Sequence, residues 1–536
     1  MAATWDFHAT GAWRTEGTFL DDFVQIAAEQ PDAVALVSYR AGVAEPLRLT
    51  YGELAERVDR IAGGLQALGV QRGEVVAVQL PNWWEFPAVV LACARIGAVV
   101  NPLVPIFRAR ELRFMLARTE SRVAVSPTTF RGFDHGALFQ ELAGELDTFT
   151  HPFALGDGFE AHFLEREHPL APGHIGPDEL SEIQFTSGTT GEPKGVMHTP
   201  NTIGSAVDAM VDVLGLDGDD VVLMASTLAH QTGFLFGLVM PLSRGMKVVY
   251  QDVWDADAAL QICHDEGVTF TMGSTTFLLD TVAAQRRRGD APPASFRYFV
   301  CGGAPIPSPL VYEARQQLDL EVVAVWGMTE NGAATLTRPG DSADVVAGSD
   351  GIAANGMEVR VVDDGGTELP VGEVGRLLVR GPNQTPGYYQ RPDLYESCLT
   401  PATDGGPPWF DTGDLAYRRD DGGIRISGRS KDLIIRGGEN VPVAEVEGAL
   451  FGHPKVREVA VVGLADDRLG ERACAVVVAE DPADAPALPE LLEHLEAVGM
   501  AKQFWPESLV VVNEMPKTPS GKIQKFVLRD ELSRRD

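Results

Sequence analysis

Residues Phe185 to Thr199 have the sequence FTSGTTGEPKGVMHT and continue a hydrophobic run that begins at Glu182. Glycines let this backbone turn tightly and point its amides at a ligand, while hydroxyl groups and one lysine add donors and charge. A Gly/Ser/Thr-rich surface loop is the plainer interpretation, but so many donors after one strand favour polyphosphate binding. The spacing GxxxxGK[ST] of a Walker A loop is not met. The candidate phosphate-binding residues are Thr186, Ser187, Gly188, Thr189, Thr190, Gly191 and Lys194.

Short β-branched runs lie on both sides of this loop and alternate with helical patterns. The helical pattern is clearest after Thr50, which forms a capping box with Glu53 and precedes a four-three repeat of apolar residues that ends at Gly69. Continuous apolar strands between helices predict an α/β fold with parallel sheets covered on both faces. The strand-like runs begin at Val75, Arg122, Asp220, Lys247, Phe296 and Glu321.

The pattern changes twice in the last third of the chain. From about Glu358, short strands with Gly, Pro and Asp turns predict antiparallel sheet or a small β-barrel. After Arg429, helices and strands alternate in a segment of about 100 residues, which is enough for a compact α+β unit.

Composition excludes some partners. The 536 residues hold 44 Lys plus Arg against 76 Asp plus Glu, a formal charge of −32 that would repel nucleic acids and anionic membranes. The longest apolar runs are about half a membrane span. The N-terminus lacks a signal-peptide pattern, and five widely spaced cysteines form no CxxC pair. We expect a cytoplasmic protein with reduced thiols, without a membrane span or nucleic-acid partner.

Three further stretches carry polar groups suited to nucleotide chemistry. In AVWGMTENG, Trp326 could stack on a purine, Thr329 could donate to a phosphate, and Glu330 could hold hydrated Mg²⁺. Taken alone, this stretch is better explained by a core tryptophan and a solvated glutamate, and only the phosphate-loop motif favours the nucleotide interpretation. Asp414 could accept two ribose hydroxyls, and Arg429 could reach ribose or phosphate; a solvated hairpin is the alternative.

The fourth stretch is MPKTPSGKIQK, near the C-terminus. Lys522 follows Ser520 and Gly521 in what should be a turn tip. A lysine at such a tip is usually just a solvated cation, but the framing by Pro, Thr and Gly indicates a positioned charge that could enter another domain's site.

With these motifs in this order, the chain resembles the adenylate-forming superfamily, which includes acyl-CoA synthetases, adenylation domains of peptide synthetases and beetle luciferases. The resemblance covers nearly the whole length. It implies a large N-terminal domain (1–428) of two α/β sheet subdomains plus a small β-barrel, a hinge (429–432), and a small mobile α+β C-terminal domain (433–536). It also implies ATP, Mg²⁺ and coenzyme A as cofactors, and two half-reactions performed by alternating domain positions.

The resemblance further implies roles for single residues. Lys522 corresponds to the lysine that bridges the substrate carboxylate and the α-phosphate, and Glu330 to the Mg²⁺ ligand. Thr329 would contact the α-phosphate, and His230 would lie at the mouth of the acyl pocket, where it could act as a gate, as packing or as a base. The remaining residues implied to bind nucleotide or pantetheine are Gly303, Ala304, Pro305, Trp326, Asp414, Ile426, Arg429, Lys431, Gly437, Gly438 and Glu439.

The leading hypothesis is therefore an acid:CoA ligase that makes an acyl-CoA through an acyl-adenylate, releasing pyrophosphate and AMP. The stretch HQTGFLFG from His230 contains no basic side chain, which suits a hydrophobic alicyclic, aromatic or medium-chain acid. A stand-alone adenylation enzyme that loads a carrier protein, a ligase that performs only one half-reaction, and an ATP-binding regulator without turnover stay as alternatives. A homodimer is a further open alternative.

Overall fold

The computed structural model of the chain describes residues 7–186, 193–304, 306–429, 434–436, 439–441, 443–466, 470–517 and 523–534. Among these residues, no helix combines the length and the apolar character needed to cross a membrane. All five cysteines are free, and four of them are buried. This confirms the expectation of unpaired, mostly buried thiols.

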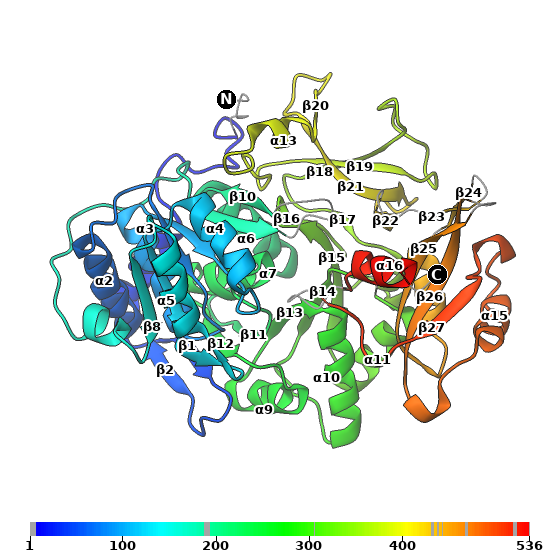
Figure 1. Ribbon diagram of the computed structural model, residues 1–536, viewed down its shortest axis with the longest axis horizontal. Helices are drawn as coiled ribbons and strands as arrows, with labels where there is room; N and C mark the ends of the chain where they lie inside the picture. Colours follow the sequence, from blue (N-terminus) through cyan, green and yellow to red (C-terminus); the bar gives the residue numbers. More distant parts are fainter. Residues whose placement is uncertain are drawn as a thin grey trace.

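A nine-stranded sheet lies at the centre of the N-terminal part, and its strands can be followed in Figure 1. The strands from β15 to β1 along the sheet run parallel, and the edge strands β17, β16 and β2 are antiparallel to their neighbours. The order is β17 (Ile352–Ala353), β16 (Gly332–Leu336), β15 (Glu321–Met328), β14 (Tyr298–Gly302), β13 (Phe270–Ser274), β11 (Val221–Met224), β12 (Lys247–Gln251), β1 (Val34–Tyr39) and β2 (Leu47–Thr50).

A second sheet has six strands, two of which flank the segment from Thr186 to Lys194. Its order is β10 (Lys194–His198), β9 (Glu182–Thr186), β4 (Val99–Pro102), β3 (Val75–Val78), β5 (Val123–Pro127) and β8 (His151–Leu155). Only the pair β9–β10 is antiparallel. A short hairpin of β6 (Thr129–Phe130) and β7 (Phe133–Asp134) follows β5.

The two sheets share one layer of helices, and each has a second layer on its outer face. Val248 of β12 packs in the core between the sheets, whereas Val249 packs in the core under the outer helices, because successive side chains point to opposite faces. The shared layer holds α1 (Phe19–Glu29), α2 (Tyr51–Ala67), α3 (Glu85–Ile96), α6 (Pro200–Leu214), α7 (Gln231–Gly233), the π-helix η2 (Phe234–Val239) and α8 (Met240–Ser243).

The outer layers differ in the helices they contain. The nine-stranded sheet is covered by α9 (Ala256–Glu266), α10 (Thr275–Arg288), α11 (Ser308–Leu318) and α12 (Ala343–Gly348). The six-stranded sheet is covered by α4 (Ala109–Thr119) and α5 (His135–Glu145), and the short π-helix η1 (Glu160–Leu164) packs near α2. Burial of both sheets on both faces explains their continuous apolar strands.

The first helix predicted from sequence has the predicted ends. The side chain of Thr50 accepts from the Glu53 amide, and Glu53 accepts from the Thr50 amide, so the capping box starts α2. Gly69 follows the last turn with φ of 81°, the left-handed conformation that glycine adopts without strain.

The third sheet is antiparallel, as the change of pattern near Glu358 indicated. Its order is β18 (Glu358–Val362), β19 (Gly375–Arg380), β21 (Trp409–Arg418) and β20 (Leu399–Thr400), with β22 (Ile424–Arg429) paired to β21. Helix α13 (Pro392–Glu396) lies in its long connection. It is this sheet that occupies the place of the small barrel expected from sequence.

The C-terminal unit is a small α+β fold with its own two cores. Its sheet has the order β24 (Glu439–Val441), β23 (Ile434–Arg436), β26 (Gly470–Ala479) and β25 (Val456–Asp466), with β27 (Ser508–Val511) paired to β26. The helices are α14 (Val443–Phe451), α15 (Leu488–Ala497) and α16 (Lys525–Ser533), with the 3₁₀ turns η3 (Pro482–Asp484) and η4 (Lys502–Phe504).

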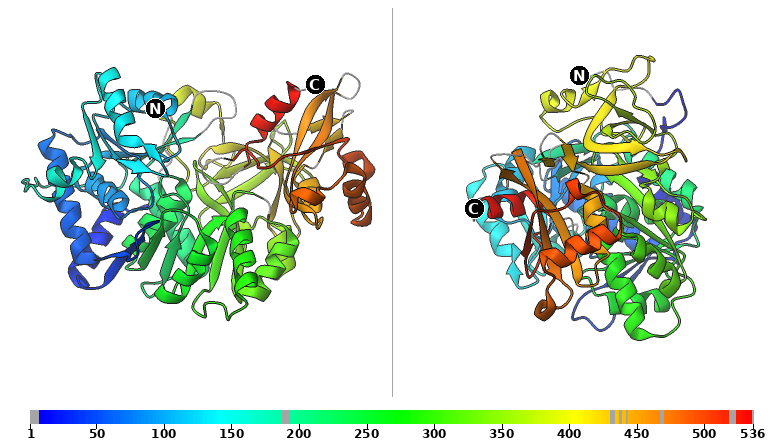
Figure 2. Two further views of the ribbon diagram at one scale, coloured as in Figure 1. Left: turned by 60° about the horizontal axis from the view of Figure 1, so that its bottom comes forward. Right: turned by 90° about the vertical axis from the view of Figure 1, so that its right-hand side faces the viewer.

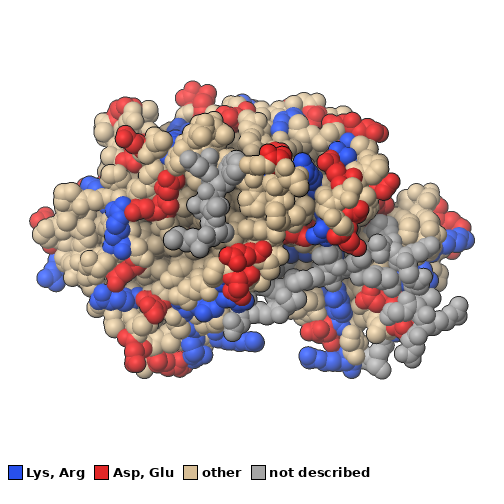
Figure 3. Space-filling view, turned by 90° about the horizontal axis from the view of Figure 1, so that it is seen from above, with Lys and Arg blue, Asp and Glu red and all other residues tan. Residues whose placement is uncertain are grey.

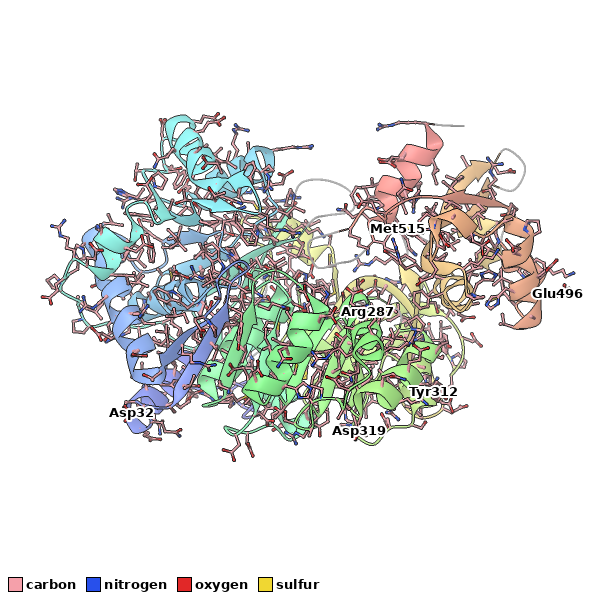
Figure 4. All side chains as sticks on the ribbon, turned by 90° about the horizontal axis from the view of Figure 1, so that it is seen from below. Asp32, Arg287, Tyr312, Asp319, Glu496 and Met515 are labelled. Carbon is pink, nitrogen blue, oxygen red and sulfur yellow. The ribbon has the colours of Figure 1, made fainter. Side chains whose placement is uncertain are left out.

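This unit stands beside the outer helices of the nine-stranded sheet (Figure 2). In Figure 4, Glu496 lies on its far side, whereas Met515 lies on the side that faces the large domain. The chain continues from Met515 to Lys517, which pairs with Glu458 at 2.7 Å. Burial raises the pKa of the Asp280 carboxyl in α10, and a hydrogen bond from Trp254 and then the charge of Lys517 oppose that shift.

The charges are mixed over the surface. On the face drawn in Figure 3, basic side chains stand among acidic ones and do not form one continuous basic area.

Candidate active site

The turn between β15 and β16 holds Thr329 and Glu330, both of which are buried. The Tyr388 hydroxyl donates to Glu330 Oε1 at 2.8 Å. The main-chain carbonyl of Glu330 accepts from the Thr385 amide at 2.6 Å. The turn therefore has a fixed position relative to the 385–388 segment, and its carboxylate is oriented by a phenol.

A buried histidine supports the same turn from the six-stranded sheet. His198 Nε2 lies 2.7 Å from the Thr329 carbonyl oxygen, which can only accept, so this nitrogen carries the proton. Its Nδ1 lies 3.0 Å from Thr202 Oγ1. Burial lowers the pKa of His198 to about 4, so the ring is neutral at pH 7. The histidine thus joins β10 to the Thr329–Glu330 turn by a neutral hydrogen bond.

The phosphate-loop residues are described only at its two ends. Thr186 and Lys194 are partners in the register of β9 and β10, so the loop leaves and re-enters the sheet at one place. Lys194 Nζ lies 4.9 Å from the centroid of the Tyr388 ring. Ser187, Gly188, Thr189, Thr190 and Gly191 lie outside the described residues.

Asp414 lies at the meeting point of β15, β21 and β22. Its Oδ2 accepts from Trp326 Nε1 at 2.9 Å, and its Oδ1 pairs with Arg429 Nε at 3.0 Å. The Asp414 and Trp326 side chains are buried, while that of Arg429 is 46% exposed. Each carboxylate oxygen keeps a further lone pair that can accept a hydroxyl. Trp326 therefore has a second task, which is to orient the carboxylate.

The expected adenine-lining residues come together at the same edge. Gly302, the last residue of β14, pairs with Val325 of β15, so Gly303 and Ala304 leave the sheet next to Trp326. A Cβ atom on Gly302 would lie 2.5 Å from the Val325 carbonyl oxygen, and Gly303 has a φ of 86°. Gly302 allows the close approach of the two strands, and Gly303 adopts the left-handed conformation of the turn. Pro305 lies outside the described residues.

Ile426 is held by Asp350, an aspartate that no sequence motif indicates. Its amide donates to Asp350 Oδ2 at 2.8 Å, and Arg425 lies 3.5 Å from the same oxygen. Burial raises the pKa of Asp350, with Arg425 opposing the shift. The only signal in the sequence is an aspartate between Ser349 and Gly351 in a turn-like segment.

The segment after His230 packs more tightly than its composition indicated. A Cβ atom on Gly233 would lie 2.2 Å from the Thr227 carbonyl oxygen, and one on Gly237 would lie 2.3 Å from Met224 Cγ. These glycines allow close packing of η2 and its flanks against β11 and the loop that follows it. A Cβ atom on Gly332 would lie 2.9 Å from Leu235, so the predicted acyl segment does lie against the Glu330 turn.

Some of the predicted site residues lie in parts of the chain that the structure does not describe. Lys522, Lys431, Gly437 and Gly438 lie outside the described residues, and Glu439 is the first residue of β24. Of the residues that support the site, sequence reasoning missed His198, Tyr388 and Asp350. His198 did lie inside the first motif, and Tyr388 follows a glycine in the sequence GYY, but neither pattern shows the partner.

The described residues fit a Mg²⁺ ion that is shared with a polyphosphate. They contain no group of three or more His, Cys, Asp and Glu side chains that could hold a metal alone. Glu330 is a buried carboxylate whose Oε2 accepts no hydrogen bond from them. One carboxylate plus phosphate oxygens and water is a usual Mg²⁺ environment.

Comparisons with known proteins agree with this geometry. Residues 23–389 match the model of the AMP-binding enzyme family, and residues 445–522 match the AMP-binding enzyme C-terminal domain. The chain belongs to the AMP-binding enzyme family.

Two curated relatives are similar over almost the whole chain. A medium-chain fatty-acid–CoA ligase of Escherichia coli (strain K12) is 34% identical over 99% of this chain and 93% of its own length. A salicyl-AMP ligase/salicyl-S-ArCP synthetase of Mycobacterium tuberculosis (strain ATCC 25618 / H37Rv) is 32% identical over 98% of this chain and 92% of its own length.

A solved structure gives the same answer at the level of the fold. ATP-bound MatB from Rhodopseudomonas palustris is 28% identical, with a TM-score of 0.84 over 96% of this chain and 99% of that one. The apo structure of the same protein gives 0.73 with the same coverage. By TM-score, the structure is therefore more similar to the ATP-bound structure of MatB than to its apo structure.

Proposed function

We propose that this protein is an acid:CoA ligase that activates a hydrophobic carboxylic acid with ATP. The observation that carries the proposal is the convergence of Glu330, Lys194, Trp326 and Asp414 at the carboxyl ends of β14 and β15 and the start of β10, within a family of AMP-binding enzymes. The curated relatives support thioester formation as the outcome.

In the first half-reaction, a carboxylate oxygen of the acid attacks the α-phosphorus of ATP, and the bond to pyrophosphate breaks. Trp326 with Gly303 and Ala304 would hold the adenine, and Asp414 with Arg429 would bind the ribose hydroxyls. Lys194 would bind the outer phosphates, and Lys522 would lie between the two reacting anions and reduce their repulsion. Mg²⁺ held by Glu330 would neutralise charge on the phosphate oxygens.

In the second half-reaction, the thiol of coenzyme A attacks the acyl carbonyl, loses its proton, and AMP leaves. Residues 433–536 would rotate about the 429–432 hinge from the 1–428 domain, so that Gly437, Gly438 and Glu439 border the pantetheine path. The acid would bind between His230 and the Glu330 turn, where the described side chains of η2 are apolar. This environment favours an alicyclic, aromatic or medium-chain acid.

A carrier-protein thiol is the second candidate acceptor. The relative named a salicyl-S-ArCP synthetase supports it, and the same pantetheine path would serve both acceptors. The free cysteines support a cytoplasmic location. A homodimer stays a prediction that light scattering on the purified protein would check.

The test is mass spectrometry of the pure protein with Mg·ATP and a panel of hydrophobic acids, with and without coenzyme A. We expect AMP and one acyl-CoA to appear together. If the acyl-adenylate reacts only with a carrier protein, the acceptor is a carrier protein and not coenzyme A. If thioester forms only from supplied adenylate, the protein performs a single half-reaction. No turnover with any acid and either acceptor would contradict the proposal.

A further inference from the structure

We propose that Tyr388 is a positioning residue that holds Glu330 and Lys194 in the arrangement required by a metal–polyphosphate complex. The proposal rests on the proposed function, because it concerns the same ATP site. It assigns a role to a side chain that touches both the expected metal ligand and the expected phosphate ligand.

The first contact orients the carboxylate. The Tyr388 hydroxyl donates to Glu330 Oε1 at 2.8 Å, and Tyr388 is only 3% exposed. Within the part of the chain that the structure describes, no hydrogen bond reaches Glu330 Oε2. The phenol therefore occupies one oxygen and presents the other for a cation.

The second contact concerns the lysine of the phosphate loop. The Lys194 ammonium lies 4.9 Å from the centroid of the Tyr388 ring, within the range of a cation–π interaction. The ring thus limits where the lysine can lie, while the hydroxyl limits where the carboxylate can lie. One side chain sets the separation between a cationic and an anionic group that would bind the same ligand.

Tyr388 is itself fixed by its neighbours. Its ring meets the edge of Tyr395 with centroids 5.7 Å apart. The Tyr395 hydroxyl donates to the Thr385 carbonyl at 2.7 Å, and the Thr385 amide donates to the Glu330 carbonyl. Because both ends of the Tyr388–Glu330 contact are tied to Thr385, the contact is preorganised before any ligand binds.

The test measures ATP binding to the full-length protein by calorimetry, at a series of MgCl₂ concentrations and without acid or coenzyme A. Tyr388→Phe removes only the hydroxyl and should weaken the apparent Mg²⁺ affinity by about 10–100-fold, the usual effect of losing a group that orients a metal ligand. Tyr388→Leu also removes the ring from Lys194, so it should weaken ATP binding at saturating Mg²⁺ as well.

Tyr51→Phe is the matched control. It also removes one buried phenol, but that phenol bonds to the main-chain carbonyls of Pro241 and Met246 and takes no part in the contacts of Tyr388 or Glu330. We expect its Mg²⁺ dependence to equal that of the wild type. Thermal melting of each variant separates loss of binding from loss of folding.

A double-mutant comparison separates positioning from a merely structural role. In a Glu330→Gln background, Tyr388→Phe should cause no further change in Mg²⁺ dependence. Wild-type Mg²⁺ dependence in Tyr388→Phe would overturn the proposal, and so would a change of equal size in the control Tyr51→Phe. If Tyr388→Phe does not fold, Glu330→Gln decides. An unchanged Mg²⁺ response in Glu330→Gln would show that Glu330 does not bind the metal, which would overturn the proposal.

The result of the Mg·ATP titration does not depend on which thiol accepts the acyl group. A wild type that binds Mg·ATP but makes no thioester would contradict the proposed ligase activity, and the same titration would still decide the role of Tyr388. A wild type that does not bind Mg·ATP would overturn both.

Discussion

At the residue scale, the protonation of Glu182 should make the stability of the folded protein depend on pH. It is fully buried in β9, and burial raises the pKa of its carboxyl to about 8. The unfolded chain releases this proton near pH 4.5, whereas the folded chain keeps it until about pH 8. The folded state is therefore favoured by this group at low pH, and that contribution is lost as the pH rises between these values.

We predict that Glu182→Gln makes the free energy of unfolding less dependent on pH in this window. The group contributes a slope of about 1.4 kcal/mol per pH unit, so the variant should gain most relative to wild type near pH 8. Urea unfolding at pH 5, 6, 7 and 8 would measure it. A wild type and variant with parallel pH profiles would show that Glu182 does not titrate in this way.

Trp326→Phe keeps an aromatic ring at the expected adenine site but removes the N–H that donates to Asp414. Hydrogen bonds to a charged group contribute about 1.5–3 kcal/mol, so we expect the KM for ATP to rise by about ten-fold or more. The KM for the acid should change little. Initial rates of pyrophosphate release at varied ATP would check this, and an equal rise in both KM values would point to a general distortion.

Lys522→Ala should abolish adenylate formation and leave thioester formation from a supplied acyl-adenylate largely intact. Removing one preorganised charge contact costs about 10²–10³ in rate. Pyrophosphate exchange and thioester formation from synthetic adenylate, measured separately, would report the two half-reactions. Survival of both would contradict the role assigned to Lys522.

At the element scale, the hairpin of β15 and β16 requires glycine at one position. A Cβ atom on Gly327 would lie 1.7 Å from the Gly332 carbonyl oxygen, so a larger residue must open the hairpin that carries Thr329 and Glu330. We expect Gly327→Ala to lower stability by about 1–3 kcal/mol and to reduce adenylate formation strongly.

Gly204→Ala is the control for this prediction. Gly204 lies inside α6, and nothing lies within 4 Å of a Cβ atom there. Alanine should stabilise the helix by about 0.5–1 kcal/mol without changing activity. Thermal melts and pyrophosphate-exchange rates of both variants would compare them, and equal behaviour of the two would show that the hairpin tolerates a side chain.

The elements themselves were largely predictable. The strands that begin at Val75, Val221 and Lys247 could be predicted because a parallel sheet covered by helices buries both faces of each strand. Such strands appear in the sequence as continuous apolar runs. The π-helix η2 was not predictable, since its turns depend on how Leu235 and Gly237 meet Gly332 and Met224.

At the scale of the whole molecule, the structure is more similar by TM-score to the ATP-bound structure of MatB than to its apo structure. Under the proposed function, thioester formation would need the C-terminal domain to move. We predict that Gly437→Trp spares acyl-adenylate formation and lowers thioester formation, because a bulky side chain would obstruct the pantetheine path. Separate assays of the two half-reactions would test this. Normal coenzyme A turnover would place the path elsewhere.

The sequence by itself determined the family, the order of the motifs and most strands and helices, because these depend on residue type and on spacing between near neighbours. Only the tertiary structure decided which side chains support the site. The contacts of Tyr388 with Glu330, Trp326 with Asp414 and His198 with Thr329 join residues 58, 88 and 131 positions apart. Such contacts are set by strand register and by how three sheets meet, and neither quantity is encoded in local periodicity.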